Sequence, residues 1–195
     1  LCIYCSDNGI RLISDEIYHG ITYGDQAVSA LEYDDNAIVI NSFSKYFSMT
    51  GWRLGWMVVT VDLIRAVECF AQTLFISAPT LSQIAGAAAF DCRPELEANV
   101  AKYAANRSLL LEQLPKAGFN RLAPADGAFY VYADVTELTN DSLSFCSRIL
   151  NDTGVAITPG VDFDPDRGHR YLRFSFAESH EKIAGAATAL IDWSS

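Results

Sequence analysis

The sequence predicts an α/β fold in which a domain with a mainly parallel sheet is followed by a smaller α+β domain. Three observations predict this fold class. Short apolar runs precede helical periodicity in the first half, a long helical pattern fills the middle, and strand patterns alternate with helical ones after Gly118. We therefore expect two domains, over residues 1–92 and 93–195.

The first domain takes its strands from short apolar runs. Strands are predicted near residues 10–14, 37–41 and 54–60, and the run from Ile10 to Ser14 has the composition of a buried strand. Apolar residues at helical spacing then predict helices over 61–74 and 80–90.

A long helix is predicted at the start of the second domain. Pro94 is typical of a helix start, and the helical pattern over 95–114 ends at Pro115 and Gly118. We expect this helix to link the two domains. The remaining elements are strands at 119–122, 128–133, 155–157 and 171–177, and helices at 142–151 and 180–192.

The segment 159–170 is predicted as a loop that borders the functional site. It contains Pro159-Gly160 and three acidic residues, Asp162, Asp164 and Asp166. The acidic spacing lacks the final bidentate glutamate of a calcium loop, so we interpret it as a solvated turn.

Composition narrows the class of protein. With 195 residues, of which 50% are hydrophobic, the chain is suited to a packed core. A net charge of -10 without any Lys/Arg run disfavours nucleic acid and anionic membranes as partners. Its apolar runs are shorter than the roughly 20 residues needed to cross a bilayer. We expect no membrane partner and a cytoplasmic location.

Five cysteines, an odd number, fit a reducing compartment better than a disulfide framework. Cys2-Ile3-Tyr4-Cys5 has the spacing of a redox pair or of half a zinc site. No second pair of cysteines or histidines completes such a site, so ordinary buried thiols are expected.

The main chemical signal follows the apolar run over 37–40. Asn41-Ser42-Phe43-Ser44-Lys45 is followed by Gly51-Trp52-Arg53-Leu54-Gly55. A lysine amine can form a Schiff base, and serine and arginine side chains can hold a phosphate. Together they indicate pyridoxal 5'-phosphate (PLP) as the cofactor.

A second group of candidates follows the run over 10–14. Asp15 and Tyr18 come directly after it, and the carboxyl ends of parallel strands meet at one edge of a sheet. Asp15 and Lys45 should therefore emerge together. Asp15 would keep the pyridine nitrogen protonated, and Tyr18 would hydrogen-bond the phenolic oxygen of PLP. A capping aspartate and a core tyrosine are the structural alternatives.

These patterns, D-x-x-Y, S-x-S-K and G-x-R-x-G in that order, resemble the class I/II aminotransferases, which have the fold type I architecture. The segment 171–176 resembles the carboxylate-binding arginine segment of the same family. The resemblance covers nearly the whole chain but only the C-terminal half of the family's proteins, and Leu1 is not an initiator methionine. We therefore expect a fragment that begins with the C-terminal part of the PLP-binding large domain.

The resemblance implies a role for each matching residue. Lys45 is the catalytic lysine, Ser42 and Arg53 bind the cofactor phosphate, and Arg173 grips the substrate α-carboxylate. Arg173 could instead pair with a surface carboxylate, and Ser44 could simply cap the turn. Trp52, Phe129 and Tyr130 line the substrate pocket or belong to the core.

The implied activity is ping-pong transamination between an amino acid and a 2-oxo acid by a homodimer. Two alternatives stay open: a PLP-dependent C–S β-lyase, and the effector-binding domain of a transcription regulator. The family's N-terminal half supplies the glycine-rich phosphate loop, the ring-stacking aromatic residue and an asparagine beside the phenolic oxygen. The fragment alone should therefore bind PLP poorly and be inactive.

Overall fold

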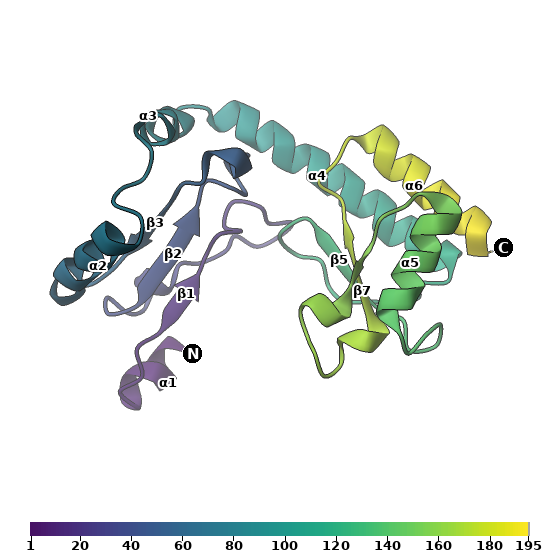
Figure 1. The fold of residues 1–195 in the computed structure, drawn as a ribbon, viewed down its shortest axis with the longest axis horizontal. Helices are drawn as coiled ribbons and strands as arrows, with labels where there is room; N and C mark the ends of the chain where they lie inside the picture. Colours follow the sequence, from purple (N-terminus) through teal and green to yellow (C-terminus); the bar gives the residue numbers. More distant parts are fainter. Residues whose placement is uncertain (195) are drawn as a thin grey trace. The chain divides into compact units, whose positions relative to one another are not determined.

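The computed structural model describes residues 1–194, and the chain forms two compact units, Leu1–Ala98 and Asn99–Ser195. Figure 1 shows the elements of each unit. The division falls within helix α4 (Arg93–Gln113), so one continuous helix contributes residues to both units. Each unit has its own sheet.

Unit 1 is built on a three-stranded sheet with the order β1-β2-β3. Strand β1 (Ile13–Asp15) pairs in parallel with β2 (Ile38–Ser42), and β2 pairs in antiparallel with β3 (Gly55–Val58). The helices of this unit are α1 (Cys2–Asp7), α2 (Val61–Leu74) and α3 (Thr80–Ala89), with short 3-10 turns η1 (Ala30–Glu32) and η2 (Thr50–Trp52). Helix α2 has the predicted bounds.

Two small apolar clusters pack in this unit. Ala30, Ala37 and Val39 form one cluster, on which Leu12 packs, and a second cluster surrounds Phe43. The prediction that the first strand is buried is wrong, because Ile13 is 61% exposed. Side chains alternate along a strand, so Leu12 packs on the cluster while Ile13, on the edge strand β1, points to the other face.

The thiols also differ from expectation in unit 1. Cys5 is buried and Cys2 is half-buried, but Cys69 and Cys92 are exposed. Cys69 lies on α2, and no residue of that helix is buried. The Cys69 thiol is therefore exposed although it lies in a helix with an apolar pattern.

Unit 2 contains an antiparallel sheet with the order β4-β5-β7-β6. Its strands are β4 (Arg121–Leu122), β5 (Tyr130–Asp134), β6 (Thr158–Pro159) and β7 (Tyr171–Ser175), and its helices are α5 (Ser142–Thr153) and α6 (His180–Ser194), together with the C-terminal part of α4. The short 3-10 turns η3 (Leu114–Ala117), η4 (Gly160–Asp162) and η5 (Gly168–Arg170) complete the unit.

The strand predicted over 155–157 is wrong. Pairing with β7 begins only at Thr158 and Pro159, because the preceding residues complete the end of α5. There Gly154 adopts a left-handed conformation and the Thr153 hydroxyl accepts a hydrogen bond from the Val155 amide.

The two central strands of unit 2 have a buried face and a partly open face. Val131 pairs with Phe174 and Ala133 with Leu172, and all four side chains are buried. Because side chains alternate along a strand, Tyr132 and its partner Arg173 lie on the opposite, half-buried face. The sheet therefore presents Arg173 away from the core.

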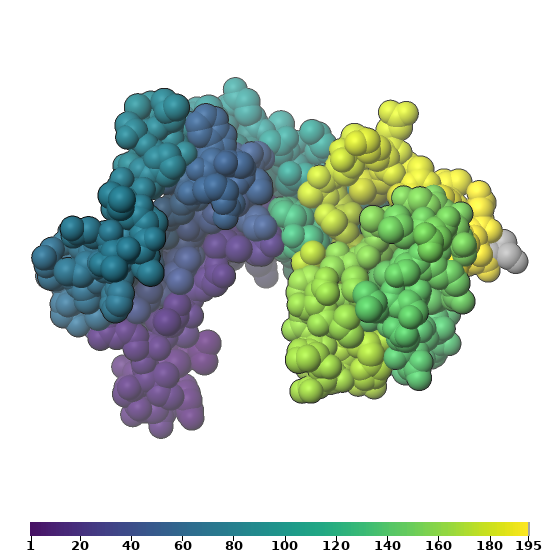
Figure 2. Space-filling model, viewed as in Figure 1, coloured from purple at the N-terminus to yellow at the C-terminus, as the bar shows by residue number. Residues whose placement is uncertain are grey.

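Large apolar side chains of α2 and α3 remain on the surface of unit 1. Figure 2 shows these helices, in blue to teal, as part of that surface. The exposed fraction is between 64% and 77% for four of these side chains: Phe70, Leu74, Leu81 and Ile84.

Among the described residues, no helix combines the length and apolar character that crossing a membrane requires.

Candidate active site

The predicted meeting of strand ends in unit 1 is confirmed. Strands β1 and β2 run in parallel with Asp15 opposite Ile40, so Asp15 and the residues after Ser42 leave the sheet at the same edge. The Asp15 side chain is exposed, and its carboxylate accepts a hydrogen bond from the Ile17 amide at 3.2 Å. This contact orients the turn that carries Tyr18.

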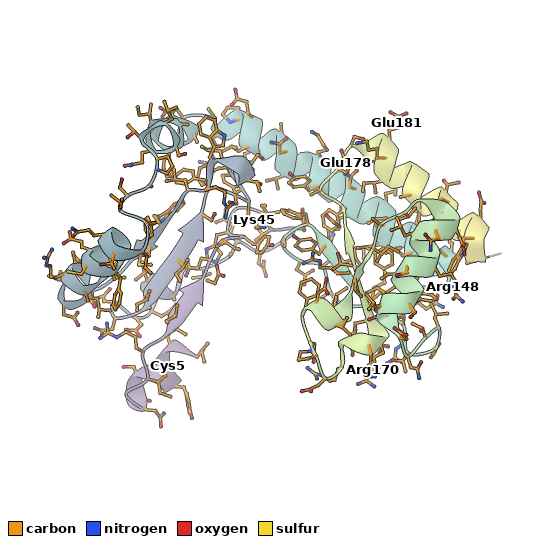
Figure 3. The ribbon with its side chains drawn as sticks, in the orientation of Figure 1. Cys5, Lys45, Arg148, Arg170, Glu178 and Glu181 are labelled. Atoms are coloured by element: carbon orange, nitrogen blue, oxygen red, sulfur yellow. The ribbon has the colours of Figure 1, made fainter. Side chains whose placement is uncertain are left out.

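Lys45 lies in the turn that follows β2 (Figure 3). Its side chain is half-buried, and its Nζ lies 5.3 Å from the centroid of the Tyr18 ring, within cation–π range. The structure thus brings together the lysine and the tyrosine that the two separate sequence patterns supplied.

A second contact joins the same two turns. Gly20, with φ of 90°, leaves room for the Tyr46 ring, since a Cβ atom there would lie 2.6 Å from the ring. The Tyr46 hydroxyl donates to Glu97 at 2.7 Å. Burial, followed by this bond to a carboxylate, raises the pKa of Tyr46 to about 12, so the phenol next to Lys45 stays neutral at physiological pH.

Ser42 ties the lysine turn to the segment that contains Arg53. Its hydroxyl donates to the Leu54 carbonyl at 3.3 Å and accepts from the Ser44 amide at 3.0 Å. The Ser44 carbonyl accepts from the Thr50 hydroxyl at 2.9 Å, so Ser44 acts through its backbone within the turn. The G-x-R-x-G segment is thereby held beside the S-x-S-K segment.

Arg53 has a left-handed backbone, with φ of 51° and ψ of 49°. This conformation is uncommon for a residue other than glycine and costs on the order of 1 kcal/mol. The exposed side chain donates from Nη1 to the Thr50 carbonyl at 2.9 Å. Arg53 also lines a cavity of about 490 Å³ together with residues 54–55, Phe75 and 77–79.

Gly55 is required for close packing at this point. A Cβ atom on Gly55 would lie 2.8 Å from the Asn41 carbonyl oxygen, whereas one on Gly51 would meet nothing within 4 Å. The backbone is thus closely approached at Gly55 but not at Gly51, which is exposed and has open space around it.

Arg173 belongs to unit 2, where β7 holds it between neighbouring strands. Its guanidinium carbon lies 4.1 Å from the Tyr130 ring centroid and 4.2 Å from that of Phe163. Its Nε is buried and has no hydrogen-bond partner among residues 1–194. A buried donor without a partner costs about 1–3 kcal/mol and calls for an explanation such as a ligand.

Sequence reasoning missed two residues in these regions. Glu16 is only 4% exposed, and its carboxylate accepts from the hydroxyls of Ser14 and Ser29 and from the Ala30 amide. Its position next to Asp15 was the only signal in the sequence. Phe163 lies in the loop that was expected to border the site, but nothing in its pattern indicated a contact with Arg173.

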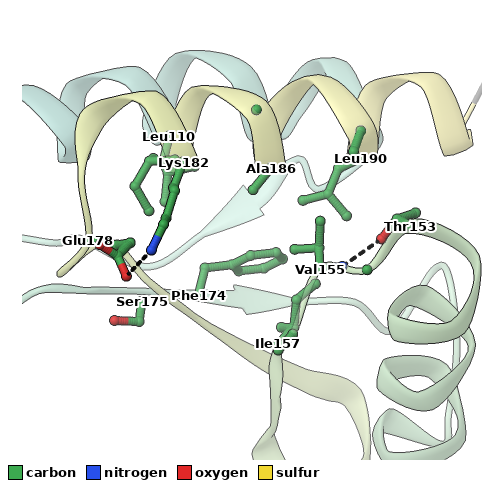
Figure 4. A pocket seen from close by; sticks show the side chains of 15 residues that line it. Leu110, Thr153, Val155, Ile157, Phe174, Ser175, Glu178, Lys182, Ala186 and Leu190 are labelled. Carbon is green, nitrogen blue, oxygen red and sulfur yellow. Dashed lines mark hydrogen bonds and ion pairs between the residues drawn. The ribbon is translucent and has the colours of Figure 1, made fainter.

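A separate cavity of about 600 Å³ lies beside α6 in unit 2 (Figure 4). Its lining includes the apolar side chains of Leu110, Phe174 and Leu190, and an ion pair of 3.1 Å joins Glu178 to Lys182. None of the residues predicted for the active site lines this cavity.

Comparison with known families decides the chain's affiliation. The model of the family described as "Aminotransferase class I and II" matches residues 2–190. The chain belongs to the class I and II aminotransferases. Solved structures of the family are similar to it: an aminotransferase from Mycobacterium tuberculosis is 51% identical, with a TM-score of 0.95 over 98% of this chain and 51% of the other.

Curated relatives are aminotransferases too. The valine–pyruvate aminotransferase of Mycobacterium tuberculosis is 52% identical over 97% of this chain and 50% of its own length. The (5-formylfuran-3-yl)methyl phosphate transaminase of Methanocaldococcus jannaschii is 40% identical over 92% of this chain and 49% of its own length. The chain thus spans about half the length of these relatives.

The class I and II aminotransferases are PLP-dependent as a family, and the residues of unit 1 fit that cofactor. An amine, a carboxylate and a phenol suit its aldehyde, ring nitrogen and phenolic oxygen, while Ser42 and Arg53 suit its phosphate. The lysine turn, the tyrosine turn and the arginine segment are linked by the contacts described above. The donor set and its arrangement therefore agree with the family's cofactor.

Proposed function

We propose that the enzyme carrying this chain transfers an amino group from an amino acid to a 2-oxo acid in a ping-pong reaction. The observation that carries this proposal is the position of Lys45. Its Nζ lies beside the Tyr18 ring, at the sheet edge from which Asp15 also emerges. PLP, when bound, supplies the aldehyde that accepts the amino group and the ring that withdraws electrons.

Lys45 has two tasks in this proposal. It would hold the cofactor covalently, and its Nζ would move the proton of the substrate α-carbon. The Tyr18 hydroxyl would donate a hydrogen bond to the phenolic oxygen of PLP. The Asp15 carboxylate would hold a proton on the pyridine nitrogen of the cofactor. Ser42 and Arg53 would bind the phosphate and so anchor the cofactor while Lys45 moves the proton.

Arg173 is proposed to bind the substrate α-carboxylate. Its buried Nε without a partner and its exclusion from the hydrophobic face of the sheet support this role. A guanidinium presents several donors in one plane, which suits a carboxylate. The name of the relative that is 52% identical makes L-valine with pyruvate the first substrate pair to assay.

The remaining parts of the proposal concern the assembly and its location. A homodimer is proposed on the strength of the family resemblance. A cytoplasmic location is proposed because an odd number of cysteines fits a reducing compartment.

The test is replacement of Lys45 in the full-length enzyme. Lys45→Ala should lower the rate of transamination at least 10²-fold, because the group that moves the α-proton is lost. Borohydride should fix the cofactor to the Lys45 peptide of the parent enzyme and to no peptide of the variant. Lys102→Ala, on the exposed face of α4, is the matched control and should behave like the parent enzyme.

Two results would contradict this proposal. One is a cofactor label on any residue other than Lys45. The other is release of pyruvate and ammonia from cystathionine without an amino acceptor, which would indicate the C–S β-lyase.

A further inference from the structure

Two aromatic rings from different segments contact the guanidinium of Arg173. Tyr130 comes from strand β5 and is fixed by the sheet, while Phe163 comes from the loop between β6 and β7. Both ring centroids lie within 4.2 Å of the guanidinium carbon. Cation–π contacts of this kind restrict the orientation of a guanidinium without using its hydrogen-bond donors. We name these two rings and Arg173 the aromatic clamp.

Phe163 is not placed there by core packing. It is 51% exposed, although large apolar side chains are more stable when buried. Its contact with Arg173 accounts for part of the ring surface that is covered.

The loop that carries Phe163 is braced by its own backbone. The Gly160 carbonyl accepts from the Phe163 and Asp164 amides, and the Asp164 carbonyl accepts from the Gly168 amide. The Asp164 carboxylate in turn accepts from the Asp166 and Arg167 amides. These bonds define the path of the chain on both sides of Phe163.

Two glycines allow the ends of this loop to touch. A Cβ atom on Gly168 would lie 2.3 Å from the Gly160 backbone, and a Cβ atom on Gly160 would lie 2.8 Å from the Tyr132 hydroxyl. The Ser142 hydroxyl also donates to the Gly168 carbonyl at 2.9 Å, which fixes the loop to α5. Phe163 is therefore held over Arg173 by a loop with little freedom to move away.

We propose that Phe163 is a positioning residue for the substrate carboxylate, acting through Arg173. The ring keeps the guanidinium in one orientation, so that a carboxylate meets donors that are already aligned. This inference rests on the proposed role of Arg173 in substrate binding. It assigns a function to a loop residue that the sequence placed in a solvated turn.

The experiment follows a single-turnover half-reaction of the full-length PLP-loaded enzyme with L-valine. Phe163→Leu, which keeps an apolar side chain but removes the ring, should raise the half-saturating concentration of L-valine by about 3- to 30-fold. The maximal rate should change much less. Phe163→Tyr retains the ring and should restore the parent value.

Two controls separate positioning from general damage to the fold. In an Arg173→Lys background, Phe163→Leu should have little further effect, because the two residues act as one unit. Isobutylamine, which is valine without its carboxylate, should inhibit the parent enzyme and Phe163→Leu with the same inhibition constant.

The outcomes also distinguish this inference from the proposed function. An undiminished effect of Phe163→Leu in the Arg173→Lys background overturns the positioning role, as does an unchanged half-saturating concentration in the single variant. If Arg173→Lys by itself leaves the half-saturating concentration of L-valine unchanged, the proposed role of Arg173 fails first.

Discussion

Single residues of this chain combine local backbone strain with a proposed role in the site. Arg53 is held in a left-handed conformation at the end of η2. The Ser42 hydroxyl donates a hydrogen bond to the carbonyl of Leu54, the residue that follows Arg53. Such strain persists where the surrounding contacts hold it, and it is often found at functional sites. The sequence singled out this segment by its residue types. It did not predict the strained backbone of Arg53, because that strain arises from contacts between segments.

Asp134 offers a test of electrostatics at the residue scale. Its carboxylate accepts hydrogen bonds from the hydroxyl and the amide of Thr136 and pairs with Arg121 at 3.1 Å. The hydrogen bonds from Thr136, with a smaller effect of Arg121, hold the pKa of Asp134 below its ordinary value of 3.8. The charged form is therefore favoured in the folded state.

The sign of the pH dependence follows from this lowered pKa. Asp134 stabilises the fold above its ordinary pKa, and this contribution is lost as the pH falls through the lower pKa of the folded state. Asp134→Asn should therefore lower the urea midpoint of unfolding at pH 7, and the difference from the parent should shrink at pH 3. Equal differences at both pH values would refute this reasoning.

At the scale of elements, Asn106 joins α4 to the start of α6. It is fully buried, its Nδ2 donates to the carbonyls of Phe176 and Glu178, and its Oδ1 lies 2.8 Å from His180 Nδ1. All three hydrogen bonds would be lost if the amide were removed. The turn between β7 and α6 therefore depends on one side chain from α4.

Replacing this side chain should weaken unit 2. Asn106→Ala should lower the free energy of unfolding by about 2–4 kcal/mol, since it removes the three hydrogen bonds that this buried amide makes. Ser108→Ala, two residues further along α4 on the exposed side, is the control and should change it by no more than about 0.5 kcal/mol. Urea unfolding followed by circular dichroism measures both, and equal effects would contradict the role assigned to Asn106.

Elements with strong periodicity were predicted well, and those that depend on distant partners were not. Helix α2 has the predicted bounds, and β5 and β7 lie within two residues of theirs at each end. The strand near Val155 failed because pairing with β7, rather than apolar composition, decides where β6 lies. Likewise Asn106 bonds to a residue 70 positions away, and Phe163 reaches Arg173 across a loop, and local patterns contain no signal for either contact.

At the scale of the whole molecule, the exposed apolar surface of unit 1 is unusual for an isolated protein. Helix α2 buries none of its residues, and the connection to α3 contains Ile76, which is 81% exposed with φ of 68°. A branched side chain in this conformation is strained. Contiguous apolar surface of this kind is typical of a contact with other protein segments.

The isolated 195-residue chain should therefore self-associate through α2. Phe70 and Leu74 are four residues apart, so they lie on one face of the helix, and both are mostly exposed. A glutamate in this face opposes association, because its charge would have to leave water. Leu74→Glu should shift the chain towards monomer in sedimentation velocity and reduce the fluorescence of a bound hydrophobic dye.

Gln72→Glu is the control for this prediction. It adds the same charge at an exposed polar position of the same helix and should change neither the sedimentation nor the dye fluorescence. A parent chain that is monomeric and binds no dye would show that this surface does not drive association, and an equal response to both glutamates would assign the effect to net charge alone.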